Sequence, residues 1–247
     1  MKNNDLLDRI KKLNLYGLIA HWDEVKEEIS LDTLIQWEEA ERQIRGMKYR
    51  LKQAKLVHFK PLSDFDWDWP KKCDREHIEE LMQLEFITEN ANVILLGPNG
   101  AGKTTIASNI AYQAILNGCK VLSTTASDML NDLISQDGDL ALRRRLRYYS
   151  NPTLLYIDEV GYLSYSTRHA DLLFEIISRR YKKGSTIITT NKPFIEWDQI
   201  FPNASCVVSL IDRLVHKSEM VTIDADSYRV KEAKERSAQR KKAPDKK

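Results

Sequence analysis

The segment from Gly97 to Thr104 reads Gly-Pro-Asn-Gly-Ala-Gly-Lys-Thr and matches the pattern G-x-x-x-x-G-K-[ST] at every fixed position. Glycines let the backbone approach a polyphosphate closely and turn its N–H groups toward it. Lys103 can reach the β- and γ-phosphates, and the Thr104 hydroxyl can ligate Mg²⁺. The segment therefore predicts a site for ATP with Mg²⁺. The predicted nucleotide-contacting residues are Gly97, Pro98, Asn99, Gly100, Ala101, Gly102, Lys103, Thr104 and Thr105.

Two adjacent acids, Asp158 and Glu159, follow the apolar run 154–157. In a phosphate-loop enzyme, the strand that ends in such acids lies close to the loop. Asp158 would then hold Mg²⁺, directly or through water, and Glu159 would orient or deprotonate the attacking water. Alone, two acids at a strand end are commonly just solvated. Together with the loop they favour ATP hydrolysis over simple nucleotide binding.

Three later residues are weaker candidates for the same chemistry. Asn191 closes the polar end of a run that includes Thr189 and could position water near the γ-phosphate, although asparagines at strand ends often only form turns. Arg213 and Arg229 could stabilise transition-state charge, often from a neighbouring subunit. Their spacing alone does not single them out, because isolated arginines are usually solvated.

The elements around these residues alternate between strands and helices. Residues 92–96 form a short apolar run before the loop, and a helix is predicted to open near Gly102. The further predicted strands are 121–124, 154–157, 186–190 and 220–223, and the further helices are 78–86, 126–134 and 170–181. This alternation predicts an α/β fold with a parallel sheet between helical layers.

Three regions of the chain are distinguished by composition. Residues 1–60 are predicted to form a helical domain that binds DNA or a partner, and Pro61 lies in a linker after it. Residues 61–230 would form the ATPase domain. Residues 231–247 are charged and poor in apolar side chains, which predicts a basic disordered tail.

Composition excludes several classes of protein. The 247 residues carry a formal net charge of only +2, so the overall charge of the protein does not point to a particular kind of partner. No apolar run approaches the ~20 residues needed to cross a bilayer, and the N-terminus lacks the apolar core of a signal peptide. We therefore expect a cytoplasmic protein without a membrane partner. Its three cysteines lie far apart without metal-ligand spacing, which is typical of reduced thiols.

Positive charge is concentrated locally in two segments. Residues 42–60 contain seven cations and no acid, and a second cluster spans residues 143–147. Such cations can neutralise DNA phosphates, although a solvated helix face or contact with a neighbouring subunit would look the same in sequence. The predicted DNA-contacting residues are Arg42, Arg45, Lys48, Arg50, Lys52, Lys55, Arg143, Arg144 and Arg145.

Taken together, these motifs resemble the IstB-like transposition helper ATPases, relatives of the DnaC-like helicase loaders in the AAA+ superfamily. The resemblance extends from the basic segment 50–56 through the loop to Ile157-Asp158-Glu159-Val160-Gly161, Thr189-Thr190-Asn191-Lys192, Asp212-Arg213-Leu214 and Ser227-Tyr228-Arg229. It covers most of the chain. Thr105 stands where a histidine is usual, and the segment 224–226 precedes Ser227 where a glycine is usual.

The resemblance implies a P-loop AAA+ fold with little or no C-terminal lid. It also implies that Asn191 is the sensor-1 residue, Arg213 the arginine finger supplied in trans, and Arg229 the sensor-2 arginine. Arg179 and Arg180 remain alternatives for the finger. Such proteins oligomerise on duplex DNA in an ATP-dependent way and activate a partner transposase.

Other functions share parts of this pattern. A DnaC-like replicative helicase loader has the same ATPase core and differs in its N-terminal region. A nucleotide-dependent scaffold would need binding but not hydrolysis. An ABC transporter ATPase is disfavoured, because no Leu-Ser-Gly-Gly-Gln segment lies between the loop and Asp158.

Overall fold

The computed structural model describes residues 7–8, 10–24, 31–56, 59–162, 165–202 and 205–242. The chain divides into two compact units, Met1–Gln53 and Ala54–Lys247. The predicted boundary at residue 60 lies in the linker, whereas the units separate within the last turn of a long helix, α3 (Leu31–Ala54).

In the first unit, a short helix packs against α3. Helix α2 (Tyr16–Ala20) and the turn η1 (Trp22–Glu24) precede α3. The buried Glu38 side chain of α3 accepts a hydrogen bond from the Leu18 backbone N–H at 3.2 Å, which satisfies a free donor in the first turn of α2. A Cβ atom on Gly17 would lie 2.2 Å from the Trp37 carbonyl oxygen, so this close approach requires glycine.

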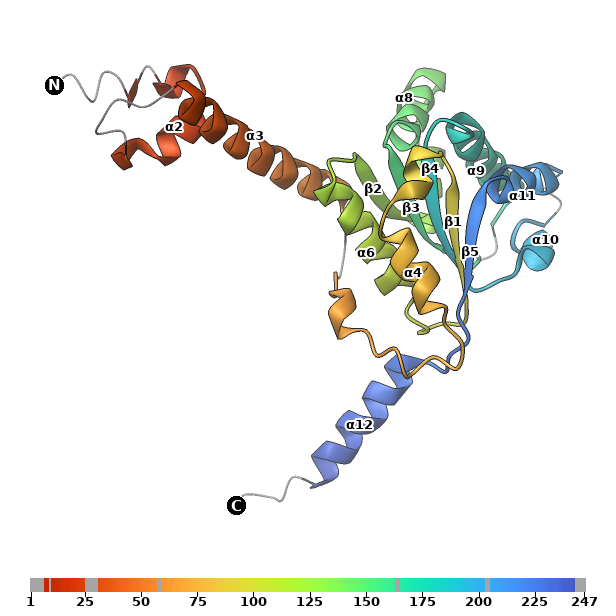
Figure 1. Cartoon of the computed structure of the whole chain (residues 1–247). Coiled ribbons are helices and arrows are strands. Elements are labelled where there is room, and N and C mark those ends of the chain that lie inside the picture. The colour runs from red at the N-terminus through yellow and green to blue at the C-terminus, as the bar shows by residue number, and fades with distance from the viewer. Residues whose placement is uncertain are drawn as a thin grey trace. The chain divides into compact units, whose positions relative to one another are not determined.

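Five parallel strands form one sheet in the order β2-β3-β4-β1-β5 (Figure 1). The strands are β1 (Asn92–Leu96), β2 (Val121–Thr125), β3 (Leu154–Val160), β4 (Ser185–Thr190) and β5 (Ser218–Thr222). In β1, Val93 pairs with Ile187 of β4 on one side and with Glu219 of β5 on the other. The predicted parallel sheet is confirmed.

The direction in which the chain winds across the sheet reverses beside β1. From β1 the chain moves to the far edge at β2, returns through β3 and β4, and then crosses β1 to reach β5. In open parallel sheets, ligands bind where the direction of winding reverses. The segment 97–104 follows β1 at this point, so the topology itself positions the phosphate loop.

Helices cover both faces of the sheet, and β3 shows how the layers divide. Leu155 and Ile157 join the core beneath α7 (Ala126–Ile134), α8 (Asp139–Ser150), α9 (Thr167–Arg180) and α11 (Val207–Val215). Tyr156, between them, faces the opposite layer, where α6 (Lys103–Leu116) crosses the sheet (Figure 1). The carboxyl end of β3 therefore faces the first turn of α6.

The segments around the sheet contain shorter elements. The helix predicted at 78–86 is instead two helices, α4 (Arg75–Leu81) and α5 (Glu85–Thr88), because Leu84 adopts a left-handed backbone with φ 67° and turns the chain. The remaining short elements are η2 (Leu62–Asp64), η3 (Phe194–Glu196) and α10 (Trp197–Ile200).

The C-terminal segment corrects one prediction. The tail predicted to be disordered from residue 231 is helical as far as it is described, in α12 (Tyr228–Lys242), and residues 243–247 lie outside the described range. Its lysines, arginines, glutamates and alanines are good helix formers, and Lys231 interacts with Glu235 one turn later. Low hydrophobicity therefore did not imply disorder here.

Among the helices that the structure describes, none is both long and apolar enough to cross a membrane.

Candidate functional site

The phosphate loop closes tightly because neighbouring segments press against its glycines. Gly100 and Gly102 have φ angles of 80° and 96°, a left-handed conformation that favours glycine. A Cβ atom on Gly100 would lie 2.5 Å from Ser227 Oγ, and one on Gly102 would lie 2.4 Å from a ring carbon of Phe65. Segments before β1 and after β5 thus shape the loop from outside.

Lys103 opens α6 and points back into the loop. Its Nζ donates hydrogen bonds to the carbonyl oxygens of Gly97 at 2.7 Å and Pro98 at 2.8 Å. The side chain is only 4% exposed, and burial lowers its pKa to about 8. The ammonium therefore lies inside the cradle that the loop forms, where phosphate oxygens could replace the two carbonyl contacts.

Thr104 and Asp158 meet where α6 begins and β3 ends. The Thr104 hydroxyl donates to the Asp158 carboxylate at 3.2 Å. A hydroxyl and a carboxylate are hard oxygen ligands of the kind that Mg²⁺ uses, and Mg²⁺ typically takes only one or two protein ligands together with substrate phosphates. The donor set thus fits the predicted metal. The described residues form no cluster of three or more His, Cys, Asp or Glu side chains suited to a metal held by protein alone.

Thr189 of β4 connects both acids, and sequence reasoning did not select it. Its buried hydroxyl donates a short hydrogen bond to Asp158 and accepts one from the backbone N–H of Glu159 at 2.9 Å. Glu159 has a left-handed φ of 62°, at a break in the register between β3 and β4. Strained backbone of this kind clusters at functional sites.

Asn191 lies beside the start of the phosphate loop. Thr190 pairs with Leu96, and the Gly97 N–H donates to the Thr190 carbonyl oxygen at 3.1 Å, so the following Asn191 is level with the loop. Its Oδ1 is buried and has no hydrogen-bond partner among the described residues. A buried acceptor left free at this place fits the predicted contact with water or phosphate.

A pocket of about 480 Å³ extends from the loop. Lys103, Thr104 and Arg229 all line it, so the structure brings the predicted sensor-2 arginine to the loop of its own chain. Four aromatic residues that the sequence did not single out as site residues also line the pocket: Phe65, Trp69, Tyr162 and Tyr228. The pocket is large enough for a nucleotide and provides apolar walls beyond the phosphate site.

The segment that carries Arg229 is fastened to the loop and to the linker. The Tyr228 N–H donates to the Gly100 carbonyl oxygen at 3.1 Å. Lys231 pairs with Asp66 at 2.9 Å, and Trp69 Nε1 donates to the Asp226 carbonyl oxygen at 2.9 Å. These contacts hold the first turn of α12 over the loop.

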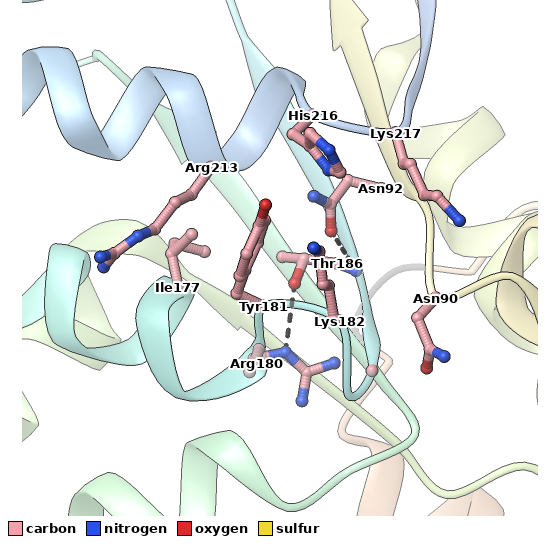
Figure 2. A pocket seen from close by; sticks show the side chains of 11 residues that line it. Asn90, Asn92, Ile177, Arg180, Tyr181, Lys182, Thr186, Arg213, His216 and Lys217 are labelled. Atoms are coloured by element: carbon pink, nitrogen blue, oxygen red, sulfur yellow. Dashed lines mark hydrogen bonds between the residues drawn. The ribbon is translucent and has the colours of Figure 1, made fainter.

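Arg213 and Arg180 have different roles at the opposite end of the sheet (Figure 2). Arg180 is 2% exposed, and its guanidinium donates to the Thr186 hydroxyl and to four backbone carbonyls, of Ser150, Pro152, Thr153 and Ser185. It is a structural residue and is not available as a finger. Arg213 contacts Ser178 and stacks on Phe174 with its guanidinium carbon 4.5 Å from the ring centre. It does not line the nucleotide pocket of its own chain.

The cavity drawn in Figure 2 is no second ligand site. Its volume is about 10 Å³, enough for about one water molecule. Lys182 and Lys217, which line it, follow the ends of α9 and α11. Cations are favoured at helix C-termini.

The residues predicted to contact DNA have unequal surroundings. In α3, Arg42, Lys48 and Lys52 are exposed, whereas Arg45 stacks on Tyr16 at 4.0 Å and lies 3.9 Å from Glu41. Arg50 is partly buried in the same helix.

In the second unit, Arg143 and Arg144 of α8 are exposed, and so is Lys55 after α3. Arg145 instead forms a short ion pair with Asp132, whose carboxylate also accepts from the Tyr149 hydroxyl at 2.5 Å. The run of arginines is therefore split by helix geometry, with Arg145 on the packed side of α8.

Comparison with known proteins places the chain in a family. The family model described as IstB-like ATP binding protein matches residues 8–236. A protein named as ATP-binding in insertion sequence IS5376 of Geobacillus stearothermophilus is 35% identical over 230 residues, covering 90% of this chain and 92% of that protein. Its counterpart in insertion sequence IS21 of Pseudomonas aeruginosa is 38% identical over 191 residues, covering 77% and 72%.

Solved structures show the fold. The crystal structure of DnaI matches with a TM-score of 0.54 and 17% identity, covering 70% of this chain and 92% of that one. The replication initiator DnaA, bound to AMPPCP and single-stranded DNA, matches with a TM-score of 0.56 and 20% identity, covering 74% and 56%. These likenesses confirm the AAA+ P-loop fold, and the family match confirms the resemblance seen in the sequence. The chain therefore belongs to the IstB-like ATP-binding protein family.

Proposed function

We propose that this protein is an ATP-hydrolysing regulator of transposition that oligomerises on duplex DNA and activates a partner transposase. The observation that carries the proposal is the meeting of Lys103, Thr104, Asp158 and Glu159 at the carboxyl edge of the sheet. Family membership supports the link to transposition, because relatives that match over most of the chain are named ATP-binding proteins of insertion sequences.

The proposed nucleotide site uses the residues that converge on the loop. Backbone N–H groups of the loop and the Lys103 ammonium bind the phosphates, and Arg229 approaches from α12. Thr104 and Asp158 hold Mg²⁺, which neutralises charge on the phosphates during transfer. Glu159 serves as the base for the attacking water, and Asn191 Oδ1 orients that water or the γ-phosphate.

The neighbouring subunit completes this site in our proposal. Arg213 lies apart from the nucleotide pocket of its own chain, which suits a finger that acts on the next protomer. A finger from the next protomer would place the nucleotide at the contact between subunits, so that ATP stabilises this contact.

Exposed cations provide the contact with DNA. Arg45, Lys48 and Lys52 recur at helical spacing along α3. Lys48 and Lys52 are best placed to reach phosphates, since both are exposed and Arg45 is engaged with Tyr16. Arg143 and Arg144 supply a second group on α8. Phosphate contacts give weak sequence specificity and steep salt dependence.

The test is to size the full chain with duplex DNA, with and without ATP and Mg²⁺, alongside Lys103→Ala. We expect a large complex only with both ligands, and none with the variant. Affinity should fall about 10³-fold between 50 and 200 mM salt if several phosphates are contacted. Assembly on a replicative helicase in place of DNA would overturn the proposal in favour of a loader.

Hydrolysis is tested separately by Glu159→Gln. This substitution keeps the side-chain shape and removes the base, so we expect tight ATP binding without turnover and complexes that persist on DNA. Stimulation of the transposase by the variant at the normal level and with normal release would instead identify a scaffold in which hydrolysis is incidental.

A further inference from the structure

The hydroxyl of Tyr156 is an unsatisfied polar group next to the phosphate loop. The side chain is 2% exposed, and its oxygen has no hydrogen-bond partner among the described residues. Leaving a buried hydroxyl unpaired costs about 1–3 kcal/mol. Phenylalanine would fill the same space without that cost, so the hydroxyl calls for an explanation.

The position of Tyr156 on β3 explains why a hydroxyl is present there. Residues two apart on a strand share a face, so Tyr156 lies on the same side of the sheet as Asp158. Thr104 and Ser108, one turn apart on α6, face them across the layer. All four line one pocket of about 350 Å³, and the other three form the polar surroundings of the Tyr156 hydroxyl. Thr104 and Asp158 are the two residues that fit Mg²⁺.

A second tyrosine in the same pocket shows what a purely structural hydroxyl looks like. Tyr149 donates its hydroxyl proton to the Asp132 carboxylate at 2.5 Å, beside Arg145, and is therefore satisfied within the protein. Tyr156 differs because its hydroxyl has no partner among the described residues, although Thr104 and Asp158 are among its polar neighbours.

We propose that Tyr156 is a positioning residue of the metal–nucleotide site, whose hydroxyl donates a hydrogen bond to the oxygens surrounding Mg²⁺ beside Asp158. This inference rests on the proposed ATPase function. Groups outside the first ligand shell orient the ligands, and their loss typically costs about 10–100-fold in metal affinity.

The experiment compares the full-length protein with Tyr156→Phe and with Tyr149→Phe as the matched control. Binding of the non-hydrolysable analogue AMPPNP is followed by calorimetry while MgCl₂ is titrated, and again in EDTA. Melting temperature is recorded with and without AMPPNP and MgCl₂. We expect Tyr156→Phe to raise the half-saturating Mg²⁺ concentration about tenfold, with unchanged AMPPNP affinity in EDTA.

Stability separates a positioning role from a packing role. We expect the ligand-free Tyr156→Phe protein to melt at the same or a higher temperature, since an unpaired hydroxyl is removed. The rise in melting temperature on adding AMPPNP and MgCl₂ should be smaller than in the wild type. Tyr149→Phe should instead lower the melting temperature equally with and without these ligands, so that its rise stays that of the wild type.

The outcomes also separate this inference from the function on which it rests. If the wild-type protein binds Mg²⁺ with AMPPNP and Tyr156→Phe has the same Mg²⁺ dependence, only the role of Tyr156 is overturned. A lower ligand-free melting temperature with normal Mg²⁺ dependence would identify a packing role and overturn it as well. If the wild-type protein binds no AMPPNP with or without Mg²⁺, the proposed function fails too.

Discussion

Thr189 donates its hydroxyl proton to Asp158, and the same oxygen accepts the backbone N–H of Glu159. One buried side chain on β4 therefore fixes both acids at the end of β3. Without this contact the Asp158 carboxylate could rotate away from Thr104, and the strained backbone at Glu159 would lose a support.

We predict that Thr189→Val lowers kcat for ATP hydrolysis about tenfold or more, because the acids lose their orientation. The matched control is Thr186→Val, a buried threonine of the same strand whose hydroxyl contacts Arg180. Both substitutions should lower the free energy of unfolding by about 1 kcal/mol, and steady-state kinetics should separate them. Equal kcat values in the two variants would contradict the positioning role of Thr189.

The lowered pKa of Lys103, about 8 against an ordinary value of 10.5, predicts pH-dependent nucleotide binding. Burial disfavours the ammonium in the free protein, whereas bound phosphates favour it. Below about pH 8 the amine is charged before and after binding, so affinity should be constant. Above it, binding must restore a proton, and the affinity for ATP should fall by up to about tenfold per pH unit.

Calorimetry at pH 8.5 in buffers of different ionisation enthalpy measures directly how many protons the protein takes up when ATP binds. Uptake should be detectable at pH 8.5 and much smaller at pH 7. Because Lys103→Ala removes the titrating group, any residual binding by that variant should show no such uptake. Equal proton uptake at both pH values would show that another group titrates.

We predict that substitution of the buried Arg180 causes a large loss of stability. Arg180→Met retains much of the apolar volume but leaves the carbonyls of Ser150, Pro152, Thr153 and Ser185 without this donor. We expect the free energy of unfolding to fall by about 3 kcal/mol or more. Arg179→Met is the control, since Arg179 pairs with Glu175 at the surface and should cost about 0.5 kcal/mol or less. Chemical denaturation measures both, and similar losses would contradict the structural role.

The position of Arg213 predicts complementation between subunits. Arg213→Ala should bind ATP normally and hydrolyse it poorly, because it leaves the next protomer's site without a finger. Mixing it with Lys103→Ala, which should bind ATP poorly but retains Arg213, should restore part of the activity. Each variant alone serves as the baseline, and an ATPase assay on the mixture with DNA is sufficient. No recovery at any ratio would assign Arg213 a role within its own chain.

Much of the nucleotide site could be predicted from local sequence. The residues from Gly97 to Thr104 must follow a strand and open a helix, and the acids at 158–159 must end a neighbouring strand, because polyphosphate binding imposes glycines, a lysine and a hydroxyl at fixed spacing. The parallel sheet followed from alternating apolar runs. The roles of Asn191, Arg213 and Arg229 came from resemblance and stay predictions.

The tertiary structure decided what depends on contacts between distant segments. Local spacing assigned no role to Thr189, Tyr156 or the aromatic residues of the pocket, because their importance arises from the atoms that each side chain meets in the folded protein. Arg180 and Arg145 look like their exposed neighbours in sequence, yet helix geometry buries one and pairs the other. Local spacing thus determined that this protein has a phosphate loop with acids beside it, whereas only the packing of strands and helices decided which side chains hold those groups in place.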